Sequence, residues 1–378
     1  MRFNPPPTPP DRMPPPDAPH LPHFPIPPRP PPAGPPEPLP APRVSVNLFL
    51  FLATVLTTMI AGSMHQGADP FASLGGLLQG LPFSASLLGI LLAHEMGHYL
   101  TSRRHGVAAT LPYFIPLPTF WIFKYFFLIG TLGAIIRMRA VVRDRRILFD
   151  IGVAGPLAGM VVAVPVTVVG LIHSEVIDIA STRGGITLGD SLLFVWISQW
   201  IFGPLGDTRT VLLHPVAFAG WLGFFVTSLN LIPMGQLDGG HVVYGVLGPR
   251  HRQLSRLAFL LLLFWGVHGA FLVFHPVQWA WALALCWTGV RIAAAVQQGR
   301  ILRFVMVFLL LFGLWHTFVP DTILWIFWAT LMSFIRLDHP PTRDVHIPLD
   351  VKRKLLGGLA LVLFLLTFIP KPFQVGAL

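Results

Sequence analysis

Residues 83–103 read FSASLLGILLAHEMGHYLTSR, an apolar run that carries His94, Glu95 and His98 in its second half. At about 1.5 Å per residue, a helix of this length spans the roughly 30 Å hydrocarbon core of a bilayer. An ionisable side chain near the centre of a membrane helix costs at least about 2.5 kcal/mol and is retained only for a reason. The run therefore predicts a membrane helix that carries a functional site.

The spacing inside this run is that of a metal site. His94 and His98 are four residues apart and share one face of a helix, so both imidazoles can reach one zinc ion at about 2.0–2.1 Å. Glu95 lies beside that face, where a carboxylate can act as general base toward metal-bound water. The chain has only three glutamates, so this pattern is improbable by accident. Its single cysteine, Cys286, excludes a cysteine-based metal cage.

A zinc site for hydrolysis usually has three protein ligands and an open fourth position. Apart from Glu95, Asp238 is the only carboxylate well inside an expected span or its break, because we expect Asp150 to open a helix. Asp238 lies in residues 230–241, NLIPMGQLDGGH, where Pro233 and several glycines interrupt an apolar run. Irregular backbone at membrane depth survives only where protein buries it or water reaches it. We expect this break to line a wet cavity and to aim Asp238 into the bundle.

The whole chain has the composition of an integral membrane protein, with 53% hydrophobic and only 11% charged residues among 378. We expect an all-α polytopic fold with about 6 to 9 transmembrane helices. The candidate spans are 44–63, 83–103, 150–172, 214–234, 256–274 and 277–294, followed by shorter runs at 303–318, 321–336 and 355–370.

Lysine and arginine give the expected orientation, because cytoplasmic loops are enriched in them. Residues 64–82 contain neither, whereas the pair Arg103 and Arg104 and the group around Arg250 lie on the opposite side. The N-terminus is therefore predicted to be cytoplasmic in a multi-pass protein, with a bacterial plasma (inner) membrane as the expected location. This topology accounts for the formal charge of +10, so we expect no nucleic-acid partner.

The expected domains are a disordered arm at 1–43, a membrane-embedded core at 44–300 and additional transmembrane segments at 301–378. Residues 5–42 hold 21 of the 39 prolines, too little aliphatic material to bury a core. The arm is either a linker or a docking site for a proline-recognising domain. Between 107 and 140, prolines and a β-rich run from Gly130 to Arg139 predict a short hairpin or strand element.

Two motifs together resemble the site-2 protease family of intramembrane zinc metalloproteases, peptidase family M50. That family combines a membrane-embedded HExxH with a later NxxPxxxLDG, and residues 94–98 and 230–239 match both patterns at every specified position. Residues 149–159, FDIGVAGPLAG, resemble the small-residue helix that follows the catalytic helix. The 113–118 and 130–139 stretches are most similar to the bacterial and plastid branch. Residues 173–213 are too few for the PDZ domain that many relatives insert there.

The resemblance implies that His94, His98 and Asp238 bind Zn²⁺ and that Glu95 activates water. It implies that Asn230 contacts the substrate backbone or the oxyanion, although capping of the broken helix is an equal alternative for this residue. The expected partners are single-span membrane-protein substrates and the lipid bilayer. Two rival functions stay open: a catalytically inactive membrane scaffold of the same fold, and a metal-ion or proton-coupled transporter, for which the sequence lacks an inverted repeat.

Overall fold

In the part of the chain that the structure describes, three helices are long and apolar enough to cross a membrane: Val44–His65, Leu74–Arg104 and Arg145–Ile172. They include the expected spans 44–63, 83–103 and 150–172. The computed structural model describes residues 44–117, 129–138, 142–179, 186–273 and 347–375, and the single positions 325, 328, 332 and 342. The expected spans 277–294 and 303–318, nearly all of 321–336 and the arm at 1–43 lie outside the described residues.

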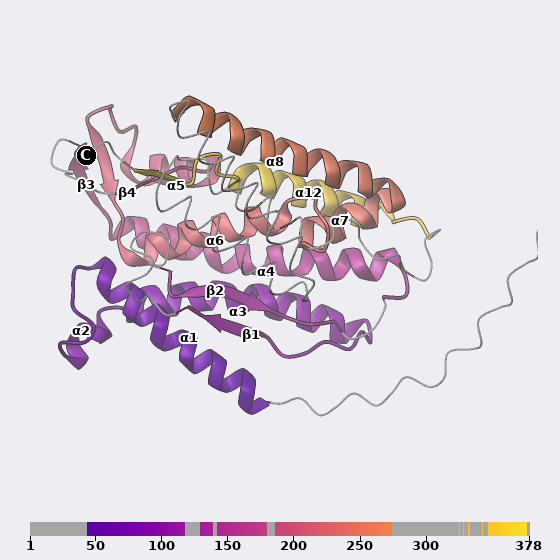
Figure 1. Cartoon of the computed structure of the whole chain (residues 1–378), viewed down its shortest axis with the longest axis horizontal. Helices are drawn as coiled ribbons and strands as arrows, with labels where there is room; N and C mark the ends of the chain where they lie inside the picture. The colour runs from indigo at the N-terminus through magenta and orange to yellow at the C-terminus, as the bar shows by residue number, and fades with distance from the viewer. Residues whose placement is uncertain are drawn as a thin grey trace, which may run out of the picture. The chain divides into compact units, whose positions relative to one another are not determined.

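The described part of the chain is mostly helical (Figure 1). Its helices are α1 (Val44–His65), α2 (Leu74–Leu78), α3 (Leu81–Arg104), α4 (Arg145–Ile172), α5 (Leu192–Phe202), α6 (Pro215–Leu231), α7 (Asp238–Leu247), the 3-10 turn η2 (Gly248–Arg250), α8 (His251–Val273) and α12 (Val351–Thr367). Helix α4 packs against α3, α6 and α7, so it is the element on which the others meet.

Among the helix boundaries that differ from the sequence expectation, two concern the helices next to the candidate site. Helix α4 begins at Arg145, not at Asp150, because the Asp144 carboxylate caps it by accepting hydrogen bonds from the amides of Arg146 and Ile147 at 2.8 and 3.1 Å. Asp150 therefore lies inside the helix. Helix α6 ends at Leu231, three residues before the expected limit, since the chain turns ahead of Pro233.

A short antiparallel hairpin confirms the strand element expected between 107 and 140. Strands β1 (Tyr113–Pro116) and β2 (Thr131–Ile135) pair with each other, and β1 packs on α1. Asn47 of α1 donates hydrogen bonds to the carbonyls of Leu111 and Pro112, at 3.1 and 2.8 Å, and Thr57 donates to that of Gly130 at 2.6 Å. These polar groups of α1 fix the position of the hairpin.

The connection between α4 and α6 contains structure that the sequence patterns did not predict. Strand β3 (Glu175–Asp178) pairs with β5 (Arg209–Leu212), and β4 (Ile186–Leu188) pairs with β6 (Phe373–Val375) at the far end of the chain. Helix α5, although apolar, has only 11 residues, too few for a straight crossing. No further domain fits in this short connection.

Candidate metal centre

Both histidines of the HEMGH motif point from α3 toward α4 through a row of small residues. A methyl group on Gly155 would lie 2.0 Å from His98 Nε2, and one on Gly159 would lie 3.2 Å from His94 Cβ. Gly97 of α3 allows the same close approach, because a methyl group there would lie 2.5 Å from the Ala154 carbonyl oxygen. Because glycine has no Cβ atom, these positions leave room for the two imidazole rings between α3 and α4.

Asp238 reaches the histidines from a tight turn between α6 and α7. Gly235 adopts φ +52°, in the left-handed region that favours glycine, and Asp238 is the first residue of α7. A methyl group on Gly239 would lie 2.0 Å from the Leu231 carbonyl oxygen, so the glycine after the aspartate permits the close return of the chain. Asp238 thus belongs to a helix start and not to irregular backbone.

The donor atoms of three side chains meet at this point. His94 Nε2 lies 3.1 Å from Asp238 Oδ2, His98 Nε2 lies 3.2 Å from Asp238 Oδ1, and the two Nε2 atoms are 3.1 Å apart. The site is buried, with both histidines and the neighbouring Glu95 between 5 and 7% exposed. Tetrahedral ligands at about 2.0–2.1 Å from zinc are about 3.3 Å from one another, so the observed triangle is close to that of a metal site.

The protonation pattern of His98 favours a cation in this triangle. His98 Nδ1 lies 2.7 Å from the Ile151 carbonyl oxygen, which can only accept, so Nδ1 carries the proton of the neutral ring. The lone pair of Nε2 then faces Asp238 Oδ1, which is also an acceptor. Asp238 Oδ2 is buried as well and faces His94 Nε2 at 3.1 Å. Two acceptor atoms that face each other at 3.2 Å inside the protein fit a metal ion bound between them.

Two nitrogens and a carboxylate oxygen form a donor set that suits Zn²⁺. Glu95 lies next to these ligands without belonging to them: the group that could hold a metal consists of His94, His98 and Asp238. The Glu95 carboxyl group accepts a hydrogen bond from the amide of Ile136, just beyond β2. The arrangement therefore places a carboxylate beside a metal site, where it can take a proton from a water molecule.

Asn230, on the last turn of α6, also reaches the site. Its Nδ2 lies 3.3 Å from His94 Nε2, and the C-cap of α6 is Ile232, so the geometry favours a place beside the metal ligands over helix capping. His241 does not reach the triangle. It is buried in α7, and a methyl group on Gly152 would lie 2.6 Å from its Cβ, as expected for a packing residue.

Sequence reasoning missed two groups that support the site. The Ile151 carbonyl orients His98, as described above, but a main-chain acceptor has no sequence signature. Ser255 of α8 braces the turn before Asp238: its hydroxyl donates to the Pro233 carbonyl and accepts from the Gly235 amide, both at 3.1 Å. A lone serine at the start of an apolar helix gives no signal of such a role.

Comparison with known proteins matches this site to a family. Residues 82–273, just over half of the chain, match the model for peptidase family M50. The chain is 37% identical over 172 residues to the probable zinc metalloprotease EGY1, chloroplastic, of Arabidopsis thaliana, which covers 44% of this chain and 30% of the relative. It is 28% identical over 216 residues to EGY2 of the same plant, another probable chloroplastic zinc metalloprotease, covering 57% and 36%.

The chain spans about a third of the length of these curated relatives. No solved structure matches it. The family match covers α3, α4, α6 and α7, and with them all the residues that meet at the candidate metal centre. The chain therefore belongs to peptidase family M50.

Proposed function

We propose that this protein is a multi-pass membrane zinc metalloprotease that hydrolyses peptide bonds of membrane-protein substrates within or near the bilayer. The observation that carries the proposal is the meeting of His94, His98 and Asp238 donor atoms beside Glu95, on a helix long and apolar enough to cross a membrane. Family membership supports the reaction class, since the curated relatives are named as probable zinc metalloproteases.

His94, His98 and Asp238 would hold the zinc ion, and Glu95 and Asn230 would take part in the reaction. Bound zinc supplies a water molecule of lowered pKa and polarises the scissile carbonyl. Glu95 takes the proton from the attacking water and delivers it to the leaving amine. The Asn230 amide donates a hydrogen bond to the oxygen on which negative charge develops. Glu95 is buried, so this proton transfer takes place inside the protein.

Strand β2 offers a place for an unwound substrate. A transmembrane helix hides its own amides, so the segment to be cleaved must become extended. Among the described residues β2 pairs only with β1, and its Leu132 and Ile135 are 61 and 56% exposed. The Ile136 amide contacts Glu95 directly after this strand. A substrate strand added to the edge of β2 would therefore pass the catalytic carboxylate.

The wider organisation follows from the sequence expectation. We infer 6 to 9 spans, a cytoplasmic N-terminus, single-span membrane proteins as substrates, and an active site nearer the cytoplasmic face. The arm at 1–43, the core at 44–300 and the segments at 301–378 are the proposed divisions. Apolar helices and family membership support a membrane location, but the curated relatives are chloroplastic and give no support to a bacterial plasma membrane in particular.

The function is tested by cleavage of a single-span model substrate in proteoliposomes, with wild-type protein and Glu95→Gln side by side. We expect the substitution to abolish cleavage while bound zinc is retained, because Glu95 lies beside the ligands and not among them. Cleavage by Glu95→Gln above about a hundredth of the wild-type rate would exclude Glu95 as general base. Absence of cleavage by wild type, with zinc bound, would favour the scaffold alternative.

A further inference from the structure

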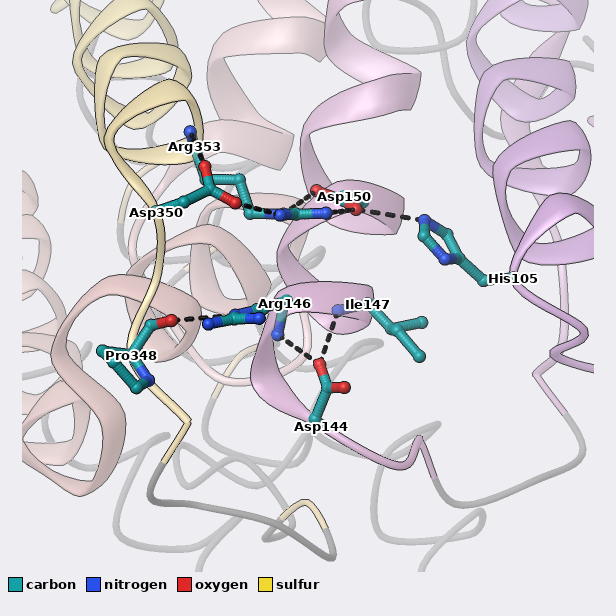
Figure 2. Close-up of polar contacts among 8 residues, drawn as sticks. All are labelled: His105, Asp144, Arg146, Ile147, Asp150, Pro348, Asp350 and Arg353. Carbon is teal, nitrogen blue, oxygen red and sulfur yellow. Dashed lines mark hydrogen bonds and ion pairs between the residues drawn. The ribbon is translucent and has the colours of Figure 1, made fainter.

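Outside the metal centre, an ion cluster links three helices at the start of α4 (Figure 2). Arg353 of α12 donates two hydrogen bonds to Asp150 of α4, from Nε to Oδ1 at 2.7 Å and from Nη2 to Oδ2 at 2.6 Å. His105, which caps α3, places its Nε2 3.0 Å from Asp150 Oδ2. A bidentate pair of this kind fixes geometry as well as charge.

The cluster adjoins the group that orients a metal ligand. Asp150 directly precedes Ile151, whose carbonyl oxygen accepts the hydrogen bond from His98 Nδ1. His105, the residue that caps α3, follows His98 by seven residues, about two helical turns, and the two histidines contact successive residues of α4. Asp150 thus sets the register of α3 on α4 at the turn that orients His98.

Helix α12 also packs on the other elements of the centre. Ala360 and Leu349 share a buried cluster with Phe149 of α4 and Val242 of α7. Val242 is one turn beyond Asp238, the first residue of α7. The segment before α12 is tied to the same end of α4, where Arg146 Nε donates to the Pro348 carbonyl at 2.8 Å. The chain's C-terminal helix thus covers the junction of the two helices that orient His98 and carry Asp238.

We propose that Asp150 is a positioning residue of the metal centre, held by His105 and Arg353, and that helix α12 is part of the framework that keeps the ligands in place. This inference rests on the proposed function for the identity of the metal. Its distinctive consequence is that a residue more than 200 positions after the HEMGH motif controls zinc affinity.

The test compares Asp150→Asn, which removes the charge at constant size, and Arg353→Met, which removes the guanidinium and keeps an unbranched apolar stem, with Lys354→Met as matched control. Lys354 is exposed on the next position of α12 and has no ion pair among the described residues. Zinc affinity is measured by chelator competition in detergent. We expect zinc to bind about tenfold more weakly in both variants and with wild-type affinity in the control. A tenfold loss of affinity is the lower end of the effect of removing a group that orients a metal ligand. The double variant should be no weaker than either single one.

A second readout separates positioning from general destabilisation. Cobalt(II) loaded in place of zinc has a visible spectrum that depends on ligand geometry, and we expect this spectrum to change in Asp150→Asn and Arg353→Met at unchanged folded yield. Wild-type affinity and spectrum in both variants would overturn the inference and leave the protease proposal standing. Failure of both variants to fold, with Lys354→Met intact, would also overturn it, since the cluster would then support the fold alone. Failure of wild type to bind zinc would overturn both.

Discussion

Gly155→Ala should remove zinc binding without changing any ligand. A methyl group on Gly155 would lie 2.0 Å from His98 Nε2, whereas ordinary contacts begin near 3.4 Å, so the ring must withdraw by more than about 1 Å. The end of the His98 side chain can move, but metal–ligand distances tolerate only about 0.2 Å. His98 cannot both avoid the new methyl group and remain a ligand.

Loss of one ligand of three should weaken zinc binding at least about 100-fold, or about 2.7 kcal/mol. This factor is the largest usually seen when a group that only orients a ligand is removed, and loss of the ligand itself should cost at least as much. Gly89→Ala is the matched control: it lies on the same helix as His98, and a methyl group there meets nothing within 4 Å. Both changes replace a helical glycine, so propensity alone should stabilise each by about 0.5–1 kcal/mol. Chelator competition and zinc content of the purified variants measure the effect. Wild-type zinc affinity in Gly155→Ala would refute the account of how α4 makes room for His98.

The remaining predictions concern the substrate and the orientation in the membrane. Asn230→Ala should retain zinc and lower kcat by roughly a hundredfold with little change in KM, because the Asn230 amide lies beside His94 and is proposed to donate a hydrogen bond to the developing negative charge. An unchanged kcat would indicate that Asn230 only packs beside the site. Cysteines placed at the exposed positions Arg104 and Arg250, in a chain with Cys286 replaced, should react with a membrane-impermeant maleimide only from the cytoplasmic side. Labelling of either cysteine from outside intact cells would contradict the predicted orientation in the membrane.

The meeting of the three residues of the candidate metal centre could be predicted because their signals are local. His94 and His98 need only helical spacing to share a face, and Asp238 stood out as a carboxylate in a broken apolar run. The small residues around Gly155 were noticed only as a resemblance to the family's helix, and their close contact with the histidines emerged from the structure. The hairpin of β1 and β2 followed from prolines and β-forming residues between two spans.

Other features depend on contacts that leave no local trace. Asp150 and Arg353 are 203 residues apart, so nothing in either neighbourhood indicates their ion pair. The pairing of β4 with β6 joins segments of only three residues each, too short for a recognisable alternation. The start of α4 was misplaced because Asp144 and Asp150 can both cap a helix, and only the backbone geometry selects Asp144.

Zinc content tests most directly whether two distant segments form one metal centre. We expect about one zinc ion per chain in the purified wild-type protein and in Glu95→Gln, and less than about a tenth in Asp238→Ala, because two histidines alone rarely hold zinc tightly. Glu95→Gln controls for loss of a buried carboxylate beside the same ligands. Stoichiometric zinc in Asp238→Ala, measured by mass spectrometry after extensive dialysis, would contradict the assignment of Asp238 as the third ligand.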